Sequence, residues 1–204
     1  MNRGDAVSYR QLQSAYADVQ RELARAGLWY EGHPLTKTEV IWCHFAPPDL
    51  RDAKGFFINE THRLYRAFGC EAGHIYVPRR VLEQGPRRYR GSLRDVLRHE
   101  FGHALAYYHP ALIRRSRAFV EAFGACYDGN WPDPPTDSVD FVTDYAMTSP
   151  MEDFAETFAR WLCNPDNPLR TLPRFRRNPH CRPTRALRAK LRFVRDVCRR
   201  LVKD

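Results

Sequence analysis

The sequence H-E-F-G-H at residues 99–103 is the feature that most constrains what this chain can fold into. It lies in a run whose apolar residues recur at helical spacing, and Ser92 with Asp95 forms a capping box directly before that run. Residues four apart on a helix share one face. The sequence therefore predicts a helix that presents His99 and His103 side by side.

Two imidazoles at this spacing can bind one zinc ion at about 2.0–2.1 Å. Glu100 is turned about 100° from His99 around the helix, so it would reach a water molecule rather than the metal. Zinc lowers the pKa of such a water toward ~7, and a carboxylate can then take its proton. We therefore predict that His99 and His103 bind zinc and that Glu100 is the general base, in preference to two surface histidines beside an unrelated glutamate.

A third ligand is needed, and His109 is the first candidate. It follows His103 at the spacing found in metzincins, and Met147 would then correspond to the methionine of their Met-turn. Metzincins, however, turn the chain at a glycine where this sequence has Ala106. A continuing helix would place His109 about 240° around from His103, away from the metal. The simpler interpretation is a histidine whose charge suits a helix C-terminus.

Glu152 is the second candidate for the third ligand. It lies four residues before Glu156 in a predicted helix over 150–162, whose opposite side is apolar. Two inward carboxylates are costly unless positive charge lies between them. We predict that Glu152 binds the metal and that Glu156 accepts a hydrogen bond from the Nδ1–H of a ligand histidine. The alternative is an acidic first turn that only stabilises the helix dipole.

The residues over 92–162 resemble the bacterial zinc-binding metallopeptidases of the gluzincin type. That family has H-E-x-G-H followed further on by Y-A-x-x-x-P-x-E-D-F-A-E-T, and a distantly similar order occurs in the catalytic domain of anthrax lethal factor. The resemblance implies a zincin-like fold and a zinc-dependent endopeptidase. It also implies that Tyr145 stabilises the oxyanion of the reaction, although a tyrosine before a helix can equally be a packing residue. Carried over by position, the site comprises His99, His103, Glu152, Glu100 and Tyr145.

The predicted elements place the chain in the α+β class, because strands precede helices instead of alternating with them. We expect a small mixed sheet, an active-site helix and C-terminal helices. The strand over 73–78 is the expected sheet edge that binds substrate as an added strand. Strands are predicted over 38–45, 54–59 and 73–78, a loop over 84–91, and helices over 9–26, 92–110, 111–124, 150–162 and 184–202.

The charge of the chain is divided between a near-neutral body and a basic C-terminal segment. Residues 170–204 carry eleven Arg and two Lys against two Asp, so they hold +11 while residues 1–169 hold −2 of the net +9. We predict a metallopeptidase domain over 1–169 and a basic helical tail over 170–204, packed on the domain or trailing from it. A nucleic-acid-binding domain would spread its positive charge over a folded face.

The expected partner is therefore a protein or peptide substrate, with nucleic acid unlikely and no membrane. One alternative is a DNA-associated protease of the Spartan type, but those proteins resemble H-E-x-x-H-x-x-x-H and position 107 here is Tyr. Another is a non-catalytic module with a structural zinc. The presence of Glu100 disfavours it, because a structural site has no use for that carboxylate. A third is an exported toxin or effector with the same fold.

The six cysteines include no C-x-x-C pair, which predicts free thiols in a reducing compartment. Only Cys181 and Cys198 are placed so that a disulfide is worth considering. The chain shows no signal peptide and no apolar run of the ~20 residues that a membrane span needs. We expect a cytoplasmic protein, with export by a specialised route left open.

Overall fold

The computed structural model describes residues 3–44, 53–59, 69–79, 92–133, 135–173, 175 and 182–202. Within these ranges the chain combines helices with one small mixed sheet, so the predicted α+β class is confirmed. The strands are β1 (Val40–Cys43), β2 (Phe56–Phe57) and β3 (Ile75–Pro78). The helices are α1 (Arg3–Arg25), α3 (Leu93–Tyr108), α4 (Arg117–Phe123), α5 (Pro150–Cys163) and α7 (Arg185–Leu201), with 3-10 turns η1 (Pro34–Lys37), η4 (Ser138–Asp140), η5 (Tyr145–Met147) and η6 (Pro168–Thr171).

The sheet has the strand order β1-β3-β2, and β3 pairs parallel with β1 and antiparallel with β2. Our expectation that the strand over 73–78 is a sheet edge is therefore wrong. All four residues of β3 are buried, which suits a strand with a neighbour on each side. Among the described residues, β2 is the edge strand on the side of α3.

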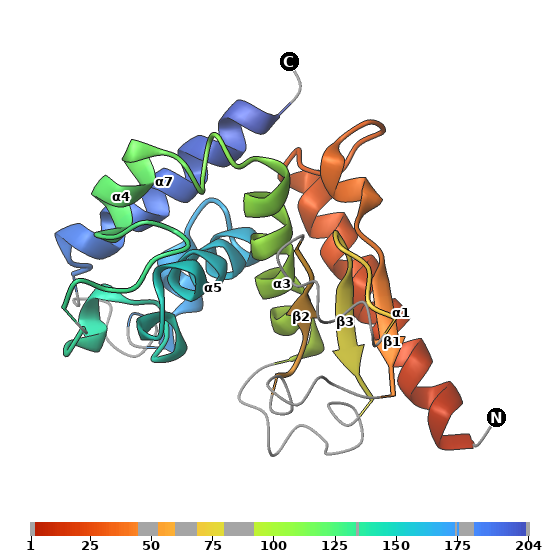
Figure 1. Ribbon diagram of the computed structural model, residues 1–204. Coiled ribbons are helices and arrows are strands. Elements are labelled where there is room, and N and C mark those ends of the chain that lie inside the picture. The colour runs from red at the N-terminus through yellow and green to blue at the C-terminus, as the bar shows by residue number, and fades with distance from the viewer. Residues whose placement is uncertain are drawn as a thin grey trace.

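Helix α3 lies between the sheet with α1 on one side and helices α4, α5 and α7 on the other (Figure 1). The predicted capping box is confirmed, because Ser92 and Asp95 exchange hydrogen bonds at the start of α3. Phe101 and Leu105 are fully buried on this central helix. A side chain at Gly102 would place Cβ only 2.9 Å from the Ala155 Cα, so glycine lets α5 approach α3 closely.

A buried arginine joins α3 to α1. Arg98 donates from Nε to Glu22 at 2.6 Å, and its Nη2 lies 2.5 Å from the other oxygen of the same carboxylate. Its Nη1 also contacts Asp95 at 2.7 Å. Paired hydrogen bonds of this kind fix direction as well as distance. The first turns of α3 are therefore held against α1.

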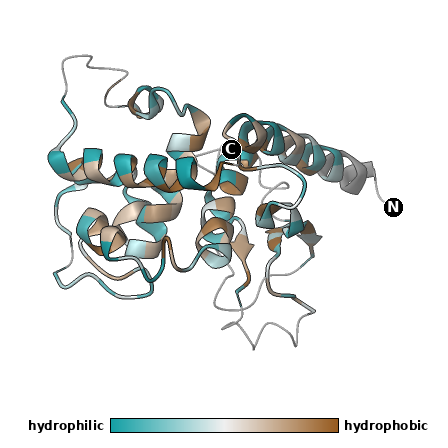
Figure 2. Ribbon diagram, turned by 90° about the horizontal axis from the view of Figure 1, so that it is seen from above, coloured by the Kyte–Doolittle hydropathy of each residue, from teal (hydrophilic) through white to brown (hydrophobic). Residues whose placement is uncertain are grey.

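The helix α7 packs on α4 and α5. Its apolar face contributes Phe193 and Val194 to the main core, and Lys190 pairs with the buried Asp153 of α5 at 2.7 Å. The outer face of α7 is hydrophilic (Figure 2). This part of the predicted basic tail is therefore packed on the domain, whereas residues 174, 176–181 and 203–204 lie outside the described residues.

Other boundaries differ from those predicted. The helix expected over 111–124 begins only at Arg117, because residues 110–115 form turns in which Arg115 donates to the Pro110 carbonyl and Ile113 becomes buried. The first helix starts at Arg3 instead of Tyr9. The loop expected over 84–91 and the end of the strand over 38–45 lie outside the described residues.

The disulfide considered as an alternative between Cys181 and Cys198 involves a residue outside the described ranges, although Cys198 itself is a buried free thiol. In the part of the chain that the structure describes, no helix is long and apolar enough to cross a membrane.

Candidate metal centre

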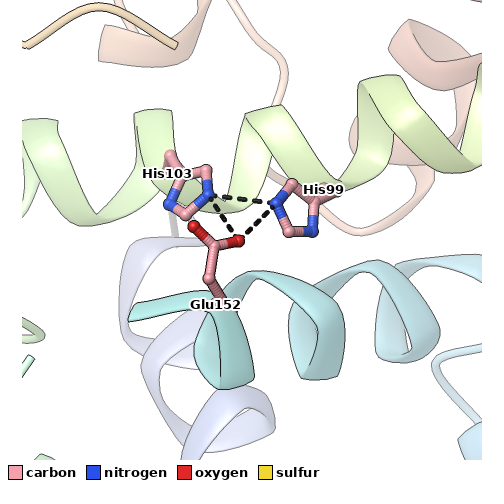
Figure 3. Close-up of side chains that lie close together, drawn as sticks. All are labelled: His99, His103 and Glu152. Atoms are coloured by element: carbon pink, nitrogen blue, oxygen red, sulfur yellow. Dashed lines mark hydrogen bonds and ion pairs between the residues drawn. The ribbon is translucent and has the colours of Figure 1, made fainter. Parts of the chain in front are cut away.

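Three side chains from two helices converge on one point (Figure 3). His99 and His103 project from successive turns of α3, and their Nε2 atoms lie 3.1 Å apart. Glu152 projects from the first turn of α5, where the Ser149 side chain caps the helix. Its Oε2 atom lies 3.0 Å from Nε2 of His99 and 3.5 Å from Nε2 of His103. The structure thus brings together the three residues that the sequence singled out as ligands.

The separations between these atoms suit a shared metal ion. Ligand atoms about 2.0–2.1 Å from one tetrahedral ion lie roughly 3.3 Å from each other. The Glu152 Oε2 atom is buried and makes no hydrogen bond of acceptable geometry, although both imidazoles are near it. The three atoms lie within 4.8 Å of one another and face the same point, so the group could hold a metal ion.

Two further side chains orient the imidazoles. Glu156 lies 2.9 Å from Nδ1 of His99, as the sequence predicted, and Tyr127 places its hydroxyl 3.2 Å from Nδ1 of His103. Partners at Nδ1 fix the ring so that Nε2 faces the metal. Thr143 donates in turn to the Glu156 carboxylate at 2.9 Å. Sequence reasoning missed Tyr127 and Thr143, because both come from irregular segments without a periodic pattern.

The carboxylates of α5 make this point of the fold favourable for positive charge. Burial lowers the pKa of His99, but the adjacent Glu152 carboxylate and the hydrogen-bonded Glu156 carboxylate outweigh burial and raise it to about 10. The pKa of Glu152 is held well below its usual range, because the two histidines outweigh the effect of burial. A cation bound between these groups would receive the same stabilisation as the imidazolium.

Glu100 lies beside the group on the wall of a cavity, and only 5% of the residue is exposed. Burial raises the pKa of Glu100, against the opposing charges of His99 and His103. The backbone of Phe57 in β2 also donates a hydrogen bond to its carboxylate. Because Ile58 directs its own backbone groups to His74 and Gly73, the adjacent Phe57 directs its N–H away from β3 and toward α3.

Tyr145 lies at the His99 end of the same cavity, with its ring centroid 5.8 Å from that of His99. It is 54% exposed, which is high for a residue whose role is only to pack. Partial burial, together with the Glu152 and Glu100 carboxylates, raises the pKa of Tyr145 above the ordinary value. Tyr145 therefore keeps its proton and can donate a hydrogen bond within the cavity.

His109 is not part of the metal group among the described residues. It follows α3 at the C-cap and lies against His33, with the ring centroids 5.6 Å apart. Burial lowers the pKa of His109, which also disfavours the charged histidine considered for the helix end. Met147 belongs to a separate apolar cluster around Phe141.

Comparison of the chain with protein-family models, curated proteins and solved structures finds no match. The interpretation of this site therefore depends on the geometry and chemistry of its residues.

Proposed function

We propose that this chain is a zinc-dependent endopeptidase with a zincin-like fold, related to the gluzincin metallopeptidases that its motifs resemble. The observation that carries the proposal is the convergence of His99, His103 and Glu152 within 4.8 Å, with Glu100 buried beside them on an open cavity. A purely structural metal site has no use for a buried carboxylate, such as that of Glu100, that lies beside the three ligands without binding the ion. Two histidines with one glutamate form a donor set typical of catalytic zinc.

When bound, zinc would supply Lewis acidity that polarises the scissile carbonyl and lowers the pKa of water toward ~7. Glu100 accepts the proton of the attacking water on a carboxylate oxygen and then delivers it to the amine nitrogen of the leaving peptide. Its raised pKa favours this return step, because a carboxyl group with a higher pKa holds the proton more readily near neutral pH.

Tyr145 donates its phenolic hydrogen to the carbonyl oxygen of the scissile bond as that oxygen gains negative charge. Its half-exposed side chain lines the cavity together with Glu100 and Glu152. Substrate aligns along the edge of β2 as an added strand, in place of the edge expected over residues 73–78. This alignment brings a peptide bond past Glu100, because Phe56 and Phe57 of β2 line the same cavity as Glu100.

The test combines metal analysis with proteolysis. Protein purified without added metal should contain about one equivalent of zinc by elemental analysis, and a proteome-derived peptide mixture should be cleaved only without chelator. The matched variant Glu100→Gln should retain the zinc and lose about 10²–10⁴-fold in cleavage rate. A Glu100→Gln protein that cleaves at the wild-type rate would falsify this mechanism.

The outer face of α7 favours a second candidate, a DNA-associated protease. Arginines at spacings of three and four follow this face, and only Arg195 has an ion pair among the described residues, with Asp196. A row of guanidinium groups suits the phosphate backbone of duplex DNA. Binding to a duplex oligonucleotide that weakens steeply with salt would support this candidate, and its loss on replacing these arginines by Gln would locate it. The row comprises Arg185, Arg188, Arg192, Arg195 and Arg199.

A further inference from the structure

Arg114 lies on the wall of the cavity that contains Glu100 and the metal group. It belongs to the turns between α3 and α4, and its side chain is only 26% exposed. Oδ2 of Asp128 accepts a hydrogen bond from Nε at 3.1 Å and lies 3.0 Å from Nη2. A guanidinium has five N–H donors, so this contact orients the group and leaves donors for a ligand.

The position of Arg114 along the cavity follows from its neighbours. Tyr145 lies beside His99, whereas Tyr127 hydrogen-bonds to His103 one helical turn further along α3. Arg114 hydrogen-bonds to Asp128, the residue that directly follows Tyr127, and lines the same cavity as Tyr127. Arg114 therefore stands at the His103 end of the cavity, and Tyr145 stands at the opposite end.

Apolar side chains line the cavity together with Arg114. Phe57 and Tyr107 contact each other with ring centroids 5.4 Å apart, and Met151 lines the same cavity. A substrate carboxylate that binds against apolar side chains in the cavity loses its water of hydration, which is costly unless a partner replaces the water. Charge-assisted hydrogen bonds from an oriented guanidinium supply that replacement and discriminate against a neutral amide.

We infer that Arg114 is a specificity-determining residue that selects peptides with a carboxylate on the His103 side of the scissile bond. The inference rests on the proposed peptidase function of the same site. The carboxylate has two sources, an acidic side chain within the substrate or the free C-terminus of a short peptide. The chemistry recognised is the same in both.

The test compares blocked peptide libraries that differ only by Glu, Gln or Lys at a fixed position, together with versions that have a free or an amidated C-terminus. Cleavage sites are read by mass spectrometry with the zinc-loaded wild type. Binding is measured by fluorescence anisotropy in the zinc-loaded Glu100→Gln background, which separates recognition from turnover. We expect a preference of about 10–100-fold for the carboxylate, the size of a hydrogen bond to a charged group.

Three variants at Arg114 define the outcome, each checked for folding by thermal unfolding and for zinc content. Arg114→Gln should abolish the preference, Arg114→Lys should retain part of it, and Arg114→Glu should shift it toward Lys-containing peptides. The inference is overturned if hydrolysis continues with the same preference in Arg114→Gln and Arg114→Glu. Absence of hydrolysis by the zinc-loaded wild type, with Arg114-dependent binding preserved, would instead overturn the proposed function alone.

Discussion

Replacing Gly102 by Ala should weaken metal binding without touching any ligand. The new Cβ would lie 2.9 Å from the Ala155 Cα and 3.3 Å from the Ala155 carbonyl oxygen and from Cδ1 of Phe158. Ordinary carbon contacts begin near ~3.5 Å, so α5 must move away from α3 by about half an ångström. Because the contacted atoms include helix backbone, a rotamer change cannot relieve the clash.

This displacement moves Glu152 relative to His99 and His103. Metal-ligand distances tolerate deviations of about 0.2 Å, so we expect an affinity loss of at least ~10-fold. Two effects oppose each other in the stability of the metal-free protein, because alanine gains about 1 kcal/mol of helix propensity while overpacking costs about 1–3 kcal/mol. The free energy of unfolding of the metal-free protein should therefore fall by only about 0–2 kcal/mol.

The assay is competition for zinc against a chromogenic chelator, together with urea unfolding of the metal-free protein. Ala186→Gly in α7 is the control, because it costs about 1 kcal/mol of helix propensity far along the chain from the ligands and should leave the affinity unchanged. A Gly102→Ala protein with wild-type affinity and higher stability would refute the argument that glycine sets the α3–α5 separation.

Three further predictions concern single side chains. Glu152→Ala should release zinc while His109→Ala retains it, and the reverse result by elemental analysis would replace our ligand set with the metzincin-like one. Tyr127→Phe removes the partner of His103 and should lower zinc affinity about 10–100-fold, so an unchanged affinity in the chelator assay would contradict its orienting role. Burial, aided by the charge of His109, lowers the pKa of His33 to about 4. The neutral form of His33 therefore stabilises the fold above pH ~6.5. This contribution, up to roughly 3 kcal/mol, is lost as the pH falls toward 4. In urea unfolding, His33→Gln should therefore lose less stability between pH 6.5 and 4 than the wild type. Stability curves of the two proteins that run parallel over this pH range would disprove the role of His33.

Helical periodicity is enough to place most of the candidate site. The spacings within α3 and α5 determine which residues share a face, so the sequence alone singles out His99, His103, Glu152 and Glu156. The order of the strands is not accessible in this way. Pairing between β3 and its neighbours is a long-range choice, and short buried strands have similar sequences at the centre and at the edge of a sheet.

Residues from irregular segments escape sequence reasoning for a similar reason. Tyr127 and Arg114 reach the cavity because the chain turns after α3 and again after α4, and no local pattern specifies those directions. The shortened α4 has the same origin. Burial of Ile113 and the hydrogen bond from Arg115 to the Pro110 carbonyl override the helical tendency of residues 111–116.

The packing of α7 has a consequence for how the chain folds. Phe193 contacts the rings of Phe119, Phe123 and Phe154 at centroid distances of 5.6–6.3 Å, and the same core contains Leu12 of α1. Contacts between residues so far apart in sequence close large loops, and the entropy of closing them slows folding. Helices α3 and α5 pack on each other, and their outer apolar faces are covered by α1 and α7, which lie near opposite ends of the sequence. The geometry of the cavity and of the candidate ligands on α3 and α5 therefore depends on core contacts supplied by both ends of the chain.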